Sequence, residues 1–351
     1  MMGLSQESQA RLEAWWKNEG FDARPCIMAW LPNKKVLPEL RYGDDEFWLE
    51  PECMLRARGQ YLESITGYGE AARSMYMDFG ANAMALQLGA RALWSDTSTI
   101  WAEPVLSDIR QVAECIPDQS WQALEHKAIE LCLDSYGQSA LTSSYCLGAP
   151  ADLSAALMGT EKLLYALVDE PEDCARAFEH IKRIIADEFA LLDDMCRRKD
   201  GRLNGWHGIW APGATTPLQE DFSCMIGEDM FRRFCVPHIR DLASMTPYSF
   251  YHLDGPGALR HLDALLEIDE LRAIQWQPGE GRLRMGEWVN VLRRILDAGK
   301  SCQVYACADD VFMLDRELGP ERMLYIVTDT EKNVRDLVDR YRLSGWDDAG
   351  C

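Results

Sequence analysis

The feature that most limits how this chain can fold is the alternation of short β-like segments with longer helical stretches. The stretch 160–197, for example, repeats its apolar residues every three or four positions and is interrupted at Pro171. Eight β-like segments separated by such stretches predict an α/β fold: a single (β/α)8 TIM barrel domain over 1–351, with a helical extension at the N-terminus. A doubly wound open sheet is the structural alternative. The eight segments lie near 25–30, 73–88, 140–146, 202–210, 248–254, 272–276, 302–307 and 324–328.

The composition narrows the kinds of partner this chain can have. Its 36 Lys and Arg against 57 Asp and Glu give a net charge of −21, which disfavours binding to nucleic acid and to anionic membrane surfaces. The N-terminus is polar and lacks the pattern of a signal peptide, and no apolar run is long enough to cross a bilayer. The twelve cysteines, from Cys26 to Cys351, form no regular framework. We therefore expect a cytoplasmic protein with reduced thiols that acts on a small molecule.

Polar residues at the ends of the predicted strands are the candidates for chemistry. In a (β/α)8 barrel the active site lies at the carboxyl ends of the strands, in the loops that follow them. The residues to consider on this ground are Asp78, Cys146, His207, His252, Asp254, Gln275, Cys307 and Thr328–Asp329.

The strongest of these candidates is the pair in "SFYHLDGPG", at 249–257. Residues i and i+2 of a strand point to the same side, so His252 and Asp254 should share one face at the strand's exit. As a functional pair they would bind a metal or act as general acid and base, and the carboxylate would raise the proton affinity of the imidazole. Alternatively, Asp254 caps the following helix or turns the glycine-rich loop, and His252 only forms a hydrogen bond inside the barrel.

Other residues have two readings each. His207, in "GWHGIW", either lines a pocket for a flat or apolar substrate or packs inside the barrel. Asp221 precedes a predicted helix, so the first interpretation is an N-cap; the alternative is a functional residue at the barrel mouth. Cys307 is either a buried small hydrophobe or a thiol ligand. We assign catalytic roles to His252, Asp254, His207 and Asp78, and substrate binding to Trp210, Asp221, Gln275 and Trp276.

Several stretches of the chain resemble the uroporphyrinogen decarboxylase superfamily. These are "CLGAPADLSAALMGTEKLLYALVDEPE" (146–172) and "DMFRRFCVPHIRDL" (229–242), followed in order by "HLDG", "IQWQPGEG" and "DAGKSCQVY". The resemblance implies a (β/α)8 barrel. It also implies one of two activities: metal-free decarboxylation of porphyrinogen acetates, or zinc-dependent methyl transfer from a methylated corrinoid protein to a thiol or folate-like acceptor.

The chain departs from the decarboxylase branch at several positions. That branch carries Arg-Gln-Ala-Gly-Arg after its first strand, where this chain has "PCIMAWLPNKKVLPEL". Lys34 and Lys35 are the nearest cations there, and they lack the bidentate fork of arginine. Ala156 stands at the position of a family tyrosine, whereas Asp78 matches the family's aspartate on the second strand. We therefore do not expect decarboxylation of uroporphyrinogen.

The methyltransferase branch fits better but also differs from this chain. That branch carries His-x-Cys where this chain has His252-Leu253-Asp254, and a second cysteine where it has Thr328-Asp329. Histidine nitrogen and carboxylate oxygen can still bind zinc. We therefore predict a zinc site of His252 and Asp254, with Cys307 as the best third ligand and His207 or Asp221 as alternatives.

The resemblance thus predicts a one-carbon methyltransferase whose methyl donor is a corrinoid protein or a similar carrier. Two alternatives stay open. One is a metal-free decarboxylase or lyase that acts on a small carboxylated substrate. The other is a barrel that binds a ligand without catalysis.

Overall fold

Parallel strand pairing organises the chain, for which a computed structural model describes residues 2–21, 24–279 and 281–346. The largest sheet has seven strands in the order β2-β1-β12-β11-β10-β9-β8, and all neighbours pair in parallel except β1 and β2. Its strands are β1 (Cys26–Pro32), β2 (Ile65–Gly69), β8 (Pro217–Gln219), β9 (Phe250–Asp254), β10 (Ala273–Gln277), β11 (Ser301–Ala306) and β12 (Met323–Val327). A second, parallel sheet contains β3 (Ser74–Tyr76), β6 (Leu141–Ser143) and β7 (Leu203–Asn204). The strands β4 (Arg91–Leu93) and β5 (Trp101–Glu103) form an antiparallel pair.

All eight β-like segments predicted from the sequence overlap a strand, in order β1, β3, β6, β7, β9, β10, β11 and β12. The sequence analysis missed β2, β4, β5 and β8, which are short or glycine-containing. Within the described residues the hydrogen-bonded ladders form three sheets and do not complete a ring. The structure therefore shows a mixed α/β fold on a mostly parallel seven-stranded sheet.

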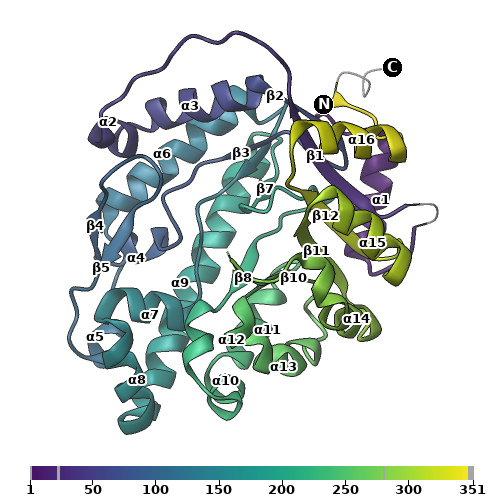
Figure 1. Cartoon of the computed structure of the whole chain (residues 1–351). Coiled ribbons are helices and arrows are strands. Elements are labelled where there is room, and N and C mark those ends of the chain that lie inside the picture. The colour runs from purple at the N-terminus through teal and green to yellow at the C-terminus, as the bar shows by residue number, and fades with distance from the viewer. Residues whose placement is uncertain (1, 22–23, 280, 347–351) are drawn as a thin grey trace.

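Helices cover the strands on several sides. Figure 1 shows α6 to α9 on one side of the strands and α14 to α16 on the opposite side. The predicted break at Pro171 is confirmed, because α8 ends at Asp169 and α9 begins with this proline, whose missing N–H costs nothing in a first turn. No helix within the described residues is long and apolar enough to cross a membrane. The helices are α1 (Gln6–Trp16), α2 (Asp44–Leu49), α3 (Pro51–Ser64), α4 (Ala83–Gln87), α5 (Ile109–Val112), α6 (Gln119–Tyr136), α7 (Pro150–Met158), α8 (Thr160–Asp169), α9 (Pro171–Arg198), α10 (Glu228–Phe234), α11 (Val236–Ala243), α12 (Gly255–Ala258), α13 (Leu262–Leu266), α14 (Val289–Asp297), α15 (Ala308–Leu318) and α16 (Glu331–Tyr341).

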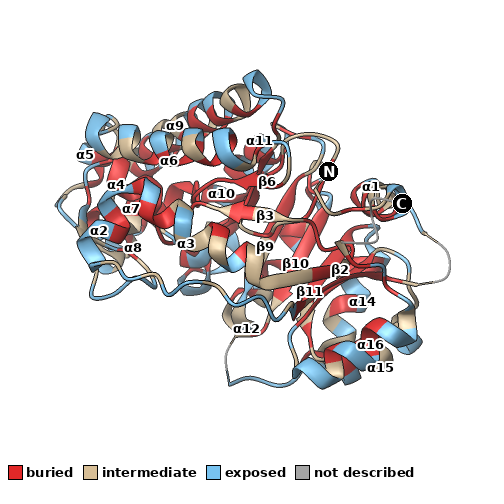
Figure 2. Cartoon of the chain, turned by 90° about the horizontal axis from the view of Figure 1, so that it is seen from above, coloured by how far each residue is buried: buried red, intermediate tan, exposed pale blue. Residues whose placement is uncertain are grey.

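The strands are buried on both faces, as Figure 2 shows by the buried residues along them and the exposed outer faces of the helices. Side chains on one face, such as Ile27 and Ile274, join the large core formed with the helices. The side chains that alternate with them, such as Met28 and Ala273, join a second core. That second core also takes Leu141 from the three-stranded sheet, so both sheets contribute to one interior.

The N-terminal helix α1 closes the amino-terminal ends of the strands. The indole of Trp15 donates to the carbonyl of Arg322, which precedes β12, at 3.0 Å. At the start of β11, Ser301 donates its hydroxyl to the carbonyl of Trp15 at 2.5 Å. These contacts put the predicted helical extension across one end of the strands and leave the carboxyl ends for a site.

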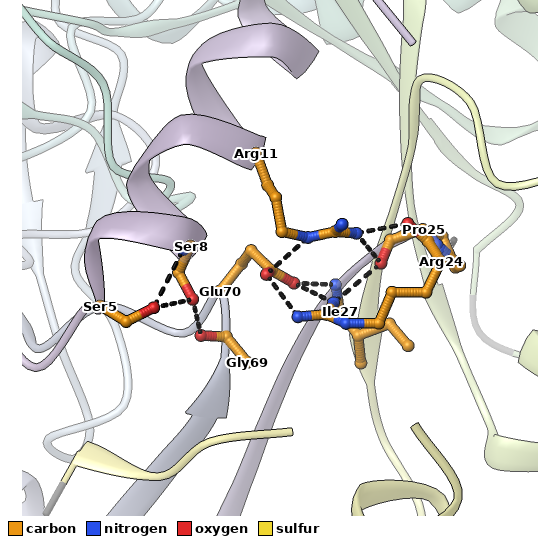
Figure 3. Close-up of polar contacts among 8 residues, drawn as sticks. All are labelled: Ser5, Ser8, Arg11, Arg24, Pro25, Ile27, Gly69 and Glu70. Carbon is orange, nitrogen blue, oxygen red and sulfur yellow. Dashed lines mark hydrogen bonds and ion pairs between the residues drawn. The ribbon is translucent and has the colours of Figure 1, made fainter. Parts of the chain in front are cut away.

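A buried ion-pair network fixes α1 to the first two strands (Figure 3). The carboxylate of Glu70, which follows β2, accepts from the Nε of Arg11 at 3.1 Å and from the backbone N–H of Ile27 at 2.7 Å. Both guanidinium Nη atoms of Arg24 donate to the same carboxylate, at 2.8 and 2.9 Å. Glu70 is fully buried. The network therefore belongs to the closed end of the strands.

The cysteines agree with the prediction of unpaired thiols as far as they are described. Eleven of the twelve are free cysteines. Cys351 lies outside the described residues.

Candidate active site

A cavity of about 480 Å³, the mouth cavity, opens at the carboxyl ends of the strands. Side chains from seven strands converge on it, as expected for strand-end residues of a parallel sheet. They are Asp78 after β3, Cys146 after β6, Trp206 after β7, Asp221 after β8, His252 on β9, Gln275 on β10 and Tyr305 on β11.

Two of these residues, Asp221 and His252, could hold one metal ion together with Asp254, the last residue of β9. A ligand atom from each of Asp221, His252 and Asp254 lies within 4.8 Å of the other two. The shared face predicted for His252 and Asp254 follows from their positions on β9. Asp254 occupies the N-cap position of α12, but its side chain makes no capping hydrogen bond in the described structure.

The buried amide of Gln275 sets the orientation of His252. The Nδ1–H of His252 donates to Oε1 of Gln275, and the amide nitrogen of Gln275 donates in turn to Oε1 of Gln303. Both glutamines are fully buried, so this chain of hydrogen bonds is shielded from water. Because Nδ1 carries the proton, Nε2 of His252 keeps its lone pair for a metal or a substrate. The indole of Trp206 meets the imidazole edge-on, with ring centroids 5.3 Å apart.

Asp221 is held by a reciprocal pair of helix caps. It is the first residue of a 3-10 turn (Asp221–Met225), so it is not the N-cap that the sequence suggested. The carboxylate of Asp152, in the first turn of α7, accepts from the backbone N–H of Asp221 at 3.0 Å and of Phe222 at 2.7 Å. Glu220 in turn accepts from the N–H of Ala151 at 3.0 Å and of Asp152 at 3.2 Å. Each element therefore caps the other, and Asp221 has a fixed backbone.

The carboxylates in this region hold their protons more tightly than usual. Burial, followed by the charge of Asp221, raises the pKa of Asp152 to about 7. Burial also raises the pKa of Glu220, and the neighbouring Asp152 adds to this rise. Burial raises the pKa of Asp221, and the carboxylate of Asp254 adds to the rise, whereas a protonated His252 would oppose it. A bound cation would relieve this clustering of negative charge.

Asp78 lies at the edge of the mouth cavity. Its carboxylate accepts from the N–H of Gly80 at 2.8 Å and lies 3.6 Å from a guanidinium nitrogen of Arg58. These contacts fix a carboxylate that faces the space where a substrate would bind.

A second cavity of about 260 Å³, the aromatic annex, adjoins the mouth cavity. The two cavities share Tyr76, Trp206 and Tyr305 in their linings. Trp30 and Tyr61 also line the annex. A third cavity of about 360 Å³ shares Asp221 with the mouth cavity and is lined by Asp152 as well. Among the described residues that line these three cavities there is no Lys or Arg.

His207 lines the annex, but its ring is fully engaged by the protein. Its Nδ1 accepts from the N–H of Ile209 at 2.9 Å. Its Nε2 therefore carries the proton and faces the hydroxyl of Thr215 at 3.4 Å, which donates onward to the carbonyl of Tyr248. Burial lowers the pKa of His207 to about 3, so this imidazole is neutral.

Three other predicted site residues lie elsewhere. Trp210 is buried in the core around α1, where its carbonyl accepts from Trp16. Trp276 alternates with Gln275 on β10 and packs against the ring of Trp288 on the helix side, 5.0 Å away. Cys307 precedes α15 and accepts from a guanidinium nitrogen of Arg284 at 2.9 Å, outside the three-residue group. The strand pattern alone could not tell which face of β10 points inward.

The sequence analysis also missed residues that shape the site. In the sequence, Asp152 is only an acidic residue in the first turn of a predicted helix, and Glu220 is only an acidic residue beside a loop. Neither pattern indicates a functional site. Tyr305 and Gln303 alternate on β11, and that alternation of polar residues on a buried strand was a usable signal.

The similarity of this chain to known proteins lies in its fold. No protein-family model matches the chain. No curated protein matches it either. Among solved structures, it is similar to a methyltransferase from Methanosarcina mazei, with a TM-score of 0.61 and 12% identity over 95% of this chain and 98% of that chain. At this identity the similarity shows a methyltransferase-like fold and no more.

Proposed function

We propose that the chain is a metal-dependent methyltransferase of the uroporphyrinogen decarboxylase-like superfamily, acting on a small molecule. The observation that carries this proposal is the grouping of Asp221, His252 and Asp254 beside a cavity, in a fold similar to that of a methyltransferase. The sequence resemblance around 146–172 and 229–242 points the same way.

The proposal includes a single (β/α)8 barrel in which the seven-stranded and three-stranded sheets form one wall. Support comes from the interior that both sheets share, and from the hydrogen bond between the N–H of Thr215, just before β8, and the carbonyl of Leu203 on β7. The annex is another support, since residues of both sheets, such as Met28 and Tyr76, line it.

We propose that Asp221 is the third metal ligand, in place of Cys307. A site with one imidazole and two carboxylates suits zinc, which takes three protein ligands and keeps one position open in catalytic sites. When bound there, zinc would act as a Lewis acid that lowers the pKa of an acceptor group. His252 would bind through Nε2 because Gln275 holds its Nδ1–H, and the reciprocal caps would keep Asp221 in position.

The methyl donor in this proposal is a methylated corrinoid protein or a similar carrier. In such a transfer the acceptor's lone pair would form the new bond to the methyl carbon, the carrier would keep the electron pair of the broken bond, and the acceptor's proton would go to solvent. Decarboxylation of a carboxylated substrate has less support, because no Lys or Arg lines the three cavities in the described residues. Methyl transfer to a neutral or cationic acceptor needs no such partner.

Metal analysis tests the proposal most directly. We expect up to one zinc per chain in protein purified without chelator, and no zinc in His252→Ala. His180→Ala, on α9, should keep its zinc, since His180 contacts the carbonyl of Cys115 instead. Zinc should also accelerate loss of the methyl group from methylcobalamin when a small thiol or amine is supplied. If the protein contains no metal, or if His252→Ala has the zinc content of the wild type, the proposal is wrong. A metal-free lyase or a barrel that binds a ligand without catalysis would then explain the structure better.

A further inference from the structure

The aromatic annex has a lining that selects for one kind of ligand. Five aromatic side chains surround its 260 Å³: Trp30, Tyr61, Tyr76, Trp206 and Tyr305. They come from β1, α3, β3, the loop after β7, and β11, so the rings approach from different directions. Aromatic side chains gathered around one cavity are typical of sites that bind methylated ammonium groups through cation–π attraction.

The charges around the annex also favour a cation. No charged residue lines the annex itself, and the adjoining mouth cavity presents the carboxylates of Asp78 and Asp221. His207 adds no positive charge, because its ring is neutral and both of its nitrogens are engaged. The net charge of −21 adds a general attraction for cations. An anionic ligand would find no positively charged partner in the described lining, and a plain ammonium would exchange a strong hydration shell for a few hydroxyl groups such as that of Ser74.

A methylated ammonium avoids that loss. Its methyl groups make it bulky and apolar at the surface, so its free energy of hydration is weaker and its burial against aromatic rings costs less. Its positive charge is still attracted to the faces of those rings. The annex adjoins the mouth cavity and shares Tyr76, Trp206 and Tyr305 with its lining. A ligand held in the annex by one end would extend with the other toward Asp221 and His252, which line the mouth cavity.

We infer that the substrate carries a methylated, positively charged ammonium head, and that the aromatic annex binds this head. The inference names the substrate class of the proposed methyltransferase, and so rests on that proposed function for the role of the ligand's other end. Binding in the annex itself needs no metal.

Calorimetric titration of the metal-free, full-length chain tests the inference. The probes are choline and its uncharged carbon isostere, 3,3-dimethylbutan-1-ol, which has the same shape without the charge. We expect choline to bind roughly 5- to 30-fold more tightly than the isostere. Equal affinities would show an apolar pocket and overturn the inference, and so would the absence of binding by choline.

Substitution of two tyrosines with similar exposure tests whether choline binds in the annex. Tyr61 lines the annex and is 64% exposed, whereas Tyr165 on α8 is 63% exposed and lies outside it. Tyr61→Ala should weaken choline binding several-fold, and Tyr165→Ala should leave it unchanged; equal effects of the two would overturn the assignment to the annex. Trp30→Leu should abolish the preference for choline over the isostere. If choline binding shows this pattern while methyl transfer and zinc are absent, the proposed function fails and the annex remains a cation site.

Discussion

Gln275 illustrates how a single buried side chain shapes the site. A fully buried amide is costly unless its hydrogen bonds are satisfied, and here they run to His252 on one side and Gln303 on the other. An apolar side chain would pack on β10 without this cost. The arrangement therefore favours a role in orienting the imidazole.

We predict that Gln275→Leu lowers zinc affinity about 10- to 100-fold, as loss of a partner that orients a metal-binding histidine does. Without the acceptor at Nδ1, the ring can rotate and its proton can move to Nε2. Competition with a chromogenic zinc chelator measures this change. Gln277→Leu, on the same strand and in the same cavity, is the control, with an expected change of less than about 3-fold. If Gln275→Leu binds zinc with wild-type affinity, Gln275 does not orient His252 for metal binding.

The lowered pKa of the buried His207 leads us to predict that the stability of the protein depends on pH. Its pKa is about 3 in the folded protein and about 6.5 in an unfolded chain, so the unfolded chain binds a proton that the folded one rejects. The stability that His207 contributes is full above pH 6.5 and decreases as the pH falls from 6.5 toward 3. Between pH 7 and pH 5 this effect amounts to about 2 kcal/mol.

Urea unfolding at pH 7 and pH 5 measures this effect. His207→Asn keeps an acceptor for the N–H of Ile209 but cannot titrate in this range. Its stability should therefore fall less between the two pH values, by about 2 kcal/mol, than that of the wild type. Parallel pH profiles for the two proteins would show that the imidazole is protonated in the fold.

At the scale of elements, the junction between α7 and the turn after β8 links stability to the site. Asp152 caps the turn that begins at Asp221, so Asp152→Ala should cost about 1–2 kcal/mol and also weaken zinc binding, about 10-fold. Asp118, which caps α6 through Ser120 and Trp121 away from the mouth, is the matched control. Asp118→Ala should lose similar stability in urea unfolding and keep the zinc affinity. Equal zinc affinities in both variants would show that the cap does not position Asp221.

The elements also show what the sequence could and could not predict. Long periodic stretches such as 160–197 and apolar strands such as 302–307 were predictable, because periodicity reports burial directly. The strand β8 has three residues, too few for a period, so the placement of Asp221 could not be predicted. The i, i+2 rule placed His252 beside Asp254, but the third member of the group comes from a distant segment. Only the folded chain brings Asp221 there.

At the scale of the whole molecule, the two ends of the strands have separate tasks. The closed end carries α1 and the Arg11–Glu70–Arg24 network, whereas the open end carries the cavities and the Asp221–His252–Asp254 group. If the two ends are independent, a substitution at the closed end should destabilise the fold without altering ligand binding at the open end. The network at the closed end tests that separation.

We predict that Glu70→Gln destabilises the protein by about 3–5 kcal/mol, because the variant removes the charge that the buried Arg11 and the partly buried Arg24 share. Glu63→Gln is the control: Glu63 pairs with Lys35 and Arg73 but is 42% exposed, so its loss should cost at most about 1 kcal/mol. Urea unfolding compares the two variants. Because the network lies at the end of the strands opposite the mouth cavity, folded Glu70→Gln should bind zinc and choline as the wild type does. A loss of either ligand at a temperature where the variant is still folded would contradict the separation of stability from function.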